Sequence, residues 1–182
     1  MQAPSGPMTA PVQALLTDGA LAGEWALDPG KSSIRLKNRS TWGLIRVNGV
    51  FREVSGNGSV YPDGQVSGTI TVAAASIDTK NTRRDTHLRS ADFFDSASHP
   101  DIIFTADGIR PSGQGIAVSG ALTVRGRTRP LSLAAVASVQ GGEIWLDAEV
   151  GVNRADFGLT WNLMGLVSMN NTLTIHAVFI RQ

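Results

Sequence analysis

Two histidines and five aspartates lie between residues 76 and 104, in the segment SIDTKNTRRDTHLRSADFFDSASHPDIIF. His87 and His99 could act as general acid or base beside the carboxylates of Asp85, Asp92, Asp95 and Asp101. The sequence offers no nucleophile-elbow motif and no HExxH-type spacing that would hold a metal. We therefore interpret the segment as a lid or connector, with no catalytic residue.

The middle of this segment predicts one short helix, from about residue 82 to 90. Thr82 and Asp85 have the spacing of a capping box, with Asp in place of the more usual Glu or Gln. Asp85 and Arg89 are four residues apart, where opposite charges meet on a helix. Leu88 would be the main apolar contact of this helix.

The residues after the helix lead back into a strand. Phe93 and Phe94 follow its end and could plug or line the mouth of the structure beside it. Pro100 disfavours a helical conformation of His99, so we expect His99 to be a hydrogen-bonded residue at the start of the strand DIIFTADGI.

Elsewhere, apolar and polar residues alternate with the period of a β-strand. The apolar set comprises Ile34, Leu36, Ile45, Val47, Phe51, Val66, Ile70, Val72, Ala74, Ile116, Val118, Leu122, Val124, Leu131, Leu133, Ala135, Ile144, Leu146, Ala148, Val150, Met169, Leu173, Ile175 and Phe179. Glycine-rich turns separate these runs. The pattern predicts an all-β fold, an antiparallel barrel of about eight long strands with the one helix.

An eight-stranded barrel can fill its interior with side chains or hold one small ligand. Several inward positions have small residues, namely Gly68, Ala74, Gly120, Ala135, Ala137 and Ala148. These residues could leave a tube open to an apolar guest, or they could mark close packing against the helix. Composition leaves both alternatives open.

Composition excludes several classes of function. The net charge is +1 over 182 residues, without the basic excess typical of nucleic-acid binders. The absence of cysteine excludes disulfides, thiolate catalysis and zinc–thiolate sites. Residues 1–22 contain three prolines and no signal-like apolar run, so we expect a flexible extension, a barrel domain over 23–182, a cytoplasmic location and no membrane span.

Four blocks of the sequence resemble the YceI-like family. They are SIDT with RDTHLRSADFF (76–94), HPDIIFT (99–105), GALTVRGRTRPLSL (120–133) and RADFGL (154–159). Their order and spacing agree with the family over roughly residues 24–181. The family-motif residues, which would belong to the lid, are Asp78, Arg84, Asp85, His87, Leu88, Arg89, Phe93 and His99.

The resemblance implies an extended, lipocalin-like barrel whose apolar tunnel binds a long isoprenoid or similar amphipathic lipid, such as a quinone or its precursor. It also implies that the helix lies over the barrel, that no metal or other cofactor is needed, and that a homodimer is one expected arrangement. The tunnel candidates are Ile34, Leu36, Ile45, Val47, Phe51, Val72, Phe94, Phe104, Leu122, Leu133, Leu146 and Phe157.

The first hairpin departs from the family because it lacks two histidines that members often carry there. Lys31 or Arg39 could take their place and favour an anionic head group. Trp42 and Trp161 could be aromatic residues at the rim or core fillers, and the high burial of large aromatics favours the core.

Two functions compete with lipid carriage. The protein could be an enzyme acting on the bound lipid, with His87 or His99 as acid or base within hydrogen-bonding reach of the ligand. It could instead be a ligand-free interaction module, which would show a large exposed apolar patch and no internal tunnel.

Overall fold

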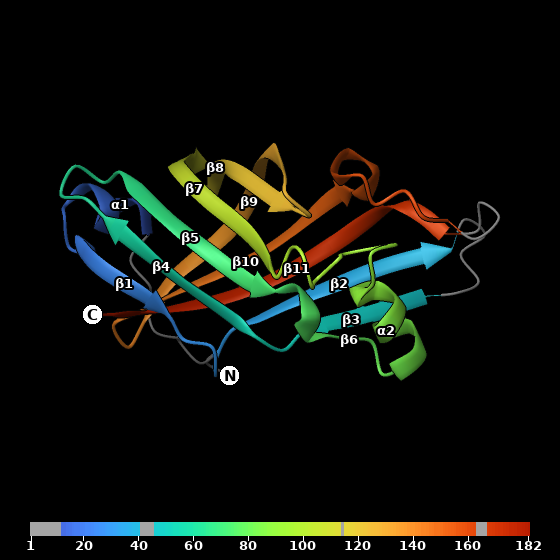
Figure 1. The fold of residues 1–182 in the computed structure, drawn as a ribbon. Coiled ribbons are helices and arrows are strands. Elements are labelled where there is room, and N and C mark those ends of the chain that lie inside the picture. Colours follow the sequence, from blue (N-terminus) through green and yellow to red (C-terminus); the bar gives the residue numbers. More distant parts are fainter. Residues whose placement is uncertain (1–11, 41–45, 114, 163–166) are drawn as a thin grey trace, which may run out of the picture.

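The protein is a closed antiparallel β-barrel with a ribbon of further strands at one side (Figure 1). The computed structural model describes residues 12–40, 46–113, 115–162 and 167–182, and only the backbone of Ser40. The strands are β1 (Gly23–Leu27), β2 (Ser33–Ser40), β3 (Arg46–Phe51), β4 (Val54–Val60), β5 (Val66–Ala73), β6 (Ile77–Asp78), β7 (Asp101–Ser112), β8 (Gly115–Val124), β9 (Arg127–Gln140), β10 (Glu143–Asn153) and β11 (Val167–Arg181). The helices are α1 (Val12–Thr17), α2 (Thr82–Arg89) and the short 3₁₀ helices η1 (Ala74–Ser76) and η2 (Arg154–Phe157).

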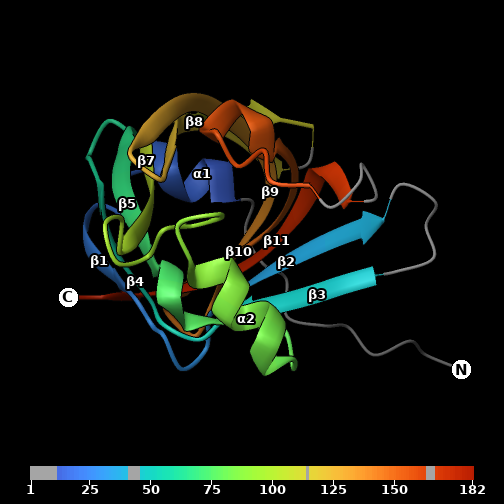
Figure 2. The same ribbon diagram turned by 45° about the vertical axis from the view of Figure 1, so that its right-hand side comes forward.

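The barrel is closed by β11, which pairs back with β1 after the order β1-β4-β5-β7-β8-β9-β10-β11. With 15 residues, β11 is long enough to serve two partners on the same side. Its residues 171–176 pair with β2, and residues 179–181 pair with β1. β2, β3 and β6 therefore continue the sheet outside the closed wall (Figure 2). The predicted all-β, antiparallel barrel of about eight strands is confirmed.

Period-two alternation builds the core of the barrel. In β8, Ile116, Val118, Leu122 and Val124 are buried, while Ser119 between them is exposed. The same face of the neighbouring strands adds aliphatic and aromatic side chains, so the apolar faces of all the strands converge on the barrel axis. Burial of these faces is the main favourable term in folding.

α2 lies beside β6 at one end of the barrel (Figure 2), and its bounds confirm the predicted helix. The predicted capping box is wrong. Asn81 is the N-cap, and its side chain accepts from the backbone N–H of Arg84 at 2.9 Å. The carboxylate of Asp85 turns away from the helix end to the backbone of Thr79, so it does not pair with Arg89.

The extension before the barrel is ordered in part, contrary to the prediction of a flexible segment over residues 1–22. Residues 1–11 lie outside the described residues, but α1 packs at the end of the barrel opposite α2 (Figure 1). Val12, Leu16 and Leu21 are buried in one cluster with Trp25, whose indole N–H donates to the Leu21 carbonyl. Burial of these apolar side chains offsets the ordering of the segment.

Four of the six small inward residues agree with the open-tube alternative that composition left open. Gly68, Ala135, Ala137 and Ala148 line an internal cavity. At Gly120, in contrast, a Cβ atom would overlap the backbone carbonyl oxygen of Thr105, and Ala74 is buried in the core. No helix among the described residues is long and apolar enough to cross a membrane.

Candidate functional site

The interior of the barrel contains two cavities arranged one after the other. The first cavity has a volume of about 110 Å³ and the second a volume of about 150 Å³. Four side chains line both cavities, namely Ile70, Phe104, Leu133 and Ile175. These four residues form a shared boundary, which we call the waist. The two cavities therefore adjoin at this boundary inside the barrel.

The first cavity lies at the α2 end. Phe93 and Phe94, which follow α2, line it together with Phe157 of η2 and aliphatic residues of the barrel wall. The Phe93 and Phe94 rings meet edge to face at 5.0 Å, and Phe94 also meets Phe51 at 6.0 Å. The segment after α2 thus closes this end with aromatic side chains.

The second cavity lies at the α1 end. Val12 and Leu16 of α1, with Leu21 and Trp25, line it. Its width comes from Gly58 and Gly68, which pair across β4 and β5 and bring no side chain into the barrel. Their neighbours Ser59 and Ser67 also line this cavity, and their hydroxyl groups form hydrogen bonds with Glu24 and Tyr61.

Most of the predicted tunnel residues line these cavities. They are Ile34, Leu36, Phe51, Val72, Phe94, Phe104, Leu122, Leu133, Leu146 and Phe157. Val47 lines neither cavity, because it pairs with Asn38 near the outer end of the β2–β3 ribbon, beyond the barrel wall. Ile45 lies outside the described residues. That these side chains hold a ligand stays a prediction.

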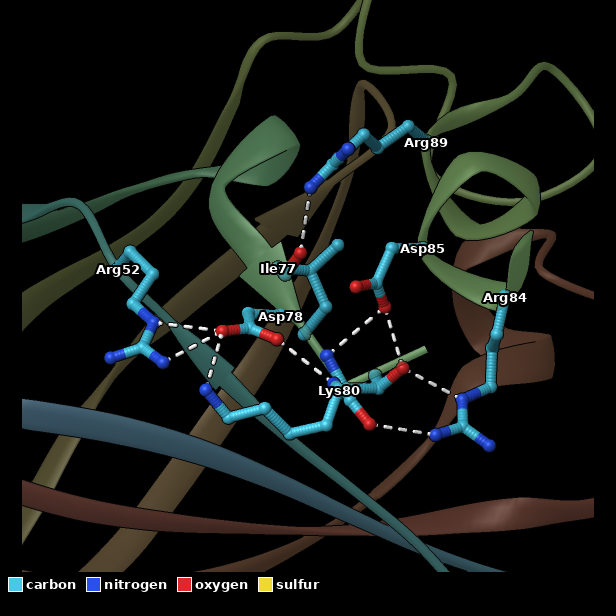
Figure 3. Close-up of polar contacts among 8 residues, drawn as sticks. Arg52, Ile77, Asp78, Lys80, Arg84, Asp85 and Arg89 are labelled. Carbon is cyan, nitrogen blue, oxygen red and sulfur yellow. Dashed lines mark hydrogen bonds and ion pairs between the residues drawn. The ribbon is translucent and has the colours of Figure 1, made fainter. Parts of the chain in front are cut away.

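The motif residues at the start of α2 fix the helix to the barrel edge (Figure 3). Asp85 accepts from the backbone N–H of Thr79 at 3.0 Å and from its hydroxyl at 2.5 Å. Arg84 donates to the same hydroxyl at 2.7 Å and to the Thr79 carbonyl at 2.8 Å, while Arg89 donates to the Ile77 carbonyl at 2.9 Å. Leu88 is buried in the core. The motif is therefore a scaffold for the lid.

Asp78 extends this scaffold on the solvent side (Figure 3). The Arg52 guanidinium donates to its carboxylate at 2.7 Å and 3.1 Å, and Lys80 adds its backbone N–H at 2.8 Å and its ammonium at 3.2 Å. The hydrogen bonds from Arg52, and then those from Lys80, hold the pKa of Asp78 well below its usual range. Because Asp78 lies on β6 and Arg52 follows β3, the pair ties the ribbon to the α2 segment.

The histidines of the motif do not line either cavity. The His87 ring packs at 4.3 Å from the Trp161 ring, and its Nε2 is buried with no hydrogen-bond partner among the described residues. His99 lies beside Gly126, and its backbone N–H donates to the Asp95 carbonyl. The described ranges also hold no cluster of His, Cys, Asp and Glu that could bind a metal.

The residues expected to hold a head group lie elsewhere. Lys31 forms an ion pair with Glu143, and Arg39 is exposed; neither lines a cavity. Trp161 is 39% exposed, so its predicted core position is wrong, and its ring packs against that of His87. Trp42 lies outside the described residues.

Sequence reasoning missed the two polar residues of the first cavity, Arg154 and Asn171. Asn171 was detectable, because it continues the inward face of Leu173 and Ile175 along β11, and a polar residue on an apolar face is a signal. Arg154 carried the same signal, because it continues the inward alternation of Val150 and Val152 at the end of β10.

The YceI-like domain matches residues 25–179, nearly the whole barrel. The chain belongs to the YceI-like family. The match begins after α1, so the helix that closes the second cavity lies outside the region that defines this YceI-like domain.

Known relatives of this YceI-like chain cover it to different extents. Protein YceI of Escherichia coli O6:H1 is 34% identical over 119 residues, which is 62% of this chain and 62% of that relative. The chain thus spans less than two thirds of that relative. The structure of Burkholderia cenocepacia BcnA matches with a TM-score of 0.76 at 21% identity, over 84% of this chain and 98% of BcnA. A polyisoprenoid-binding domain from Saccharophagus degradans matches with a TM-score of 0.70 at 16% identity, over 87% and 98%. At these identities the two structures show a shared fold.

Proposed function

We propose that this protein binds a long-chain isoprenoid or similar amphipathic lipid, such as a quinone or its precursor, inside the barrel for storage, transport or shielding. The observation that carries this proposal is the pair of apolar cavities that meet at the waist. Together they form an elongated space, which suits a chain better than a compact ligand.

The energetics of the cavities favour an apolar chain. Each CH₂ group taken from water into such a space contributes about 0.8 kcal/mol. Phe104 and Leu133 at the waist would touch the chain from both compartments. Arg154 and Asn171, the polar side chains of the first cavity, would orient the head group toward the α2 end.

The structural neighbours support the ligand class. The Saccharophagus degradans domain is described as polyisoprenoid-binding, so this fold can accommodate such a chain in at least one protein. Carriage also agrees with the position of His87 and His99 away from the cavities, whereas an enzyme acting on the bound lipid would need one of them beside it. A homodimer and a cytoplasmic location stay predictions.

The interaction-module alternative finds less support. The large apolar residues that are exposed, Tyr61, Val136, Trp161 and Ile180, come from four different segments of the described chain. Single exposed apolar residues are common on protein surfaces. The two adjoining apolar cavities are the feature that this alternative leaves unexplained.

A cavity-filling pair of variants tests the proposal. Ala135 on β9 lines the second cavity, and Ala134 beside it is exposed on the outer face. Calorimetric titration with the twenty-carbon alcohol geranylgeraniol should show binding to the natural protein. Ala135→Phe should weaken that binding about tenfold or more, because the added ring occupies the chain's space.

Ala134→Phe is the matched control and should keep the affinity within about twofold. Absence of binding to the natural protein, by geranylgeraniol and by a quinone with an isoprenoid tail, would contradict the proposal. Equal affinities of the two variants would place any binding outside the barrel and contradict it as well.

A further inference from the structure

The β2–β3 ribbon carries a row of basic side chains on one face. Successive residues of a strand point to opposite faces of the sheet, so Arg35, Lys37 and Arg39 of β2 share one face. Arg46 of β3 pairs directly with Arg39 and therefore lies on that face as well. All four side chains are exposed. We call these four residues the basic patch.

The basic patch faces away from the interior of the barrel. Ile34 and Leu36, which alternate with the basic residues along β2, line the first cavity, and Asn38 is buried. β2 and β3 project from the closed wall as a ribbon (Figure 2). From Arg35 to Arg39 the patch extends over about 13 Å at the rise of a β-strand. The patch is thus an outer surface, one layer of sheet away from the first cavity.

The basic patch has no counter-charge within the chain. No carboxylate among the described residues forms an ion pair with it. The residues outside the described ranges contain no Asp or Glu, so they cannot supply one. Asp78 on the neighbouring β6 is already paired with Arg52 and Lys80, and Glu149 lies on β10, two strands from β2. The net charge of +1 therefore hides a local excess of positive charge.

The fold brings these like charges together instead of separating them. Arg39 and Arg46 are directly opposite each other in an antiparallel pair, an arrangement that destabilises a sheet when the charges have the same sign. On its other side, β2 pairs with the uncharged Thr172 and Thr174 of β11, which give no compensation. An external anionic partner would offset this repulsion.

We infer that the basic patch docks this protein onto an anionic lipid surface, a bilayer whose phosphate head groups carry net negative charge. Such a surface presents many anionic groups in one plane, and each Lys or Arg near it strengthens binding about fivefold. A nucleic acid is the less favoured polyanion, because its binding proteins carry a larger basic excess than +1.

Docking by the basic patch would place the ribbon against the bilayer, with the first cavity directly behind it. This inference goes beyond the proposed function and does not depend on it, since a barrel that holds no lipid could still dock. The two are also measured separately, because geranylgeraniol titration reports on the interior and vesicle binding reports on the outer face.

Flotation with vesicles tests the inference. Vesicles of phosphatidylcholine alone are neutral, and vesicles that also contain phosphatidylglycerol are anionic, so the two preparations differ in surface charge. We expect the natural protein to bind the anionic vesicles at least about tenfold more tightly at low salt, and high salt should release it because salt screens exposed charges. Equal binding to both preparations, or binding to neither, would overturn the inference.

A matched pair of double variants assigns the binding to the basic patch. Lys37→Gln with Arg39→Gln removes two charges from it, whereas Arg110→Gln with Arg129→Gln removes two from exposed positions on β7 and β9, at least three strands from β2. The patch variant should bind the anionic vesicles about thirtyfold more weakly, and the control should stay within about threefold of the natural protein. Equal losses in the two variants would overturn the inference.

A DNA duplex serves as the competing polyanion in the same experiment. Binding of the natural protein to this duplex should be weaker than its binding to the anionic vesicles. Tighter binding to the duplex, lost in the patch variant, would overturn the assignment to a lipid surface. Circular dichroism checks that both variants are folded, and the comparison of vesicles with the natural protein decides the matter if the patch variant is not.

Discussion

The two ends of the barrel are closed in different ways. At the α2 end, the cavity is closed by Phe93 and Phe94, and its lining includes Arg154 and Asn171. At the α1 end, the closing side chains come from Val12 and the residues packed with it, and they are apolar. The side chains that close the α1 end are therefore hydrocarbon, whereas the cavity at the α2 end has Arg154 and Asn171 in its lining.

This difference gives the interior a direction. An amphipathic ligand would bind with its head at the α2 end and its tail at the α1 end, since the reverse would bury a polar group without partners. The two ends also differ in origin within the chain. Arg154 and Asn171 lie inside the region that matches the YceI-like domain, whereas α1 precedes it. Both polar side chains thus lie in the family domain, and the α1 end is completed by a segment that precedes the match.

The largest loss of stability is expected at the α2 end, when the buried Arg154 side chain is replaced. Arg154→Met should lower the free energy of unfolding by about 3 kcal/mol, because the carbonyls of Leu159, Trp161 and Ser168 lose their donor. Urea unfolding followed by circular dichroism measures this change. Arg129→Met, on an exposed arginine, should change it by less than about 0.5 kcal/mol. Similar values for both variants would show that Arg154 does not hold the η2 segment.

A change at the α1 end should have a smaller effect. Leu16→Ala should lower the free energy of unfolding by about 1–2 kcal/mol, less than a central core leucine, because α1 can detach before the barrel unfolds. Hydrogen exchange should then show faster exchange in α1 and unchanged exchange in β8. Thr17→Ala, on an exposed residue of the same helix, is the control. Loss of protection across β8 would mean that α1 is part of the barrel core.

The smallest effect is expected from Asp78 beside α2, whose contribution to stability should depend on pH. The Asp78 pKa is lowered in the folded protein from an ordinary value of 3.8, so its contribution to stability is present above that value and is lost as the pH falls below about 4. Asp78→Asn should therefore lower the melting temperature at pH 7 slightly, and the difference should shrink on acidification. Asp92→Asn, on an exposed residue outside the network, is the control. A difference independent of pH would exclude the charge as the cause.

The barrel was predictable because the alternation of apolar and polar residues, which is visible in each strand by itself, requires the whole sheet to bury one face. Every second residue of β8 and its neighbours is apolar, and a sheet with one apolar face must bury that face. The helix at 82–89 was predicted from a capping box and an Asp85–Arg89 pair; its bounds are right although neither contact forms. Its cap was not predictable, because Asn81 and Thr82 are both acceptable caps and tertiary contacts of Asp85 decide between them.

The site was predictable only in its apolar part. The strand period identified residues such as Phe51 and Leu122, which line the first cavity. The same period wrongly predicted that Val47 lines the interior, because alternation does not show where a strand leaves the barrel. α1 was missed because a helix of six residues has no stability of its own and forms by docking its apolar side chains.

Native mass spectrometry of the protein as purified from its host tests the central claim most directly. We predict an additional mass bound to the folded protein, which organic extraction releases as an isoprenoid or related lipid with an oxygen-rich head group. A bare mass that stays unchanged after incubation with isoprenoid phosphates and quinones would contradict the claim that the barrel is a container for a lipid.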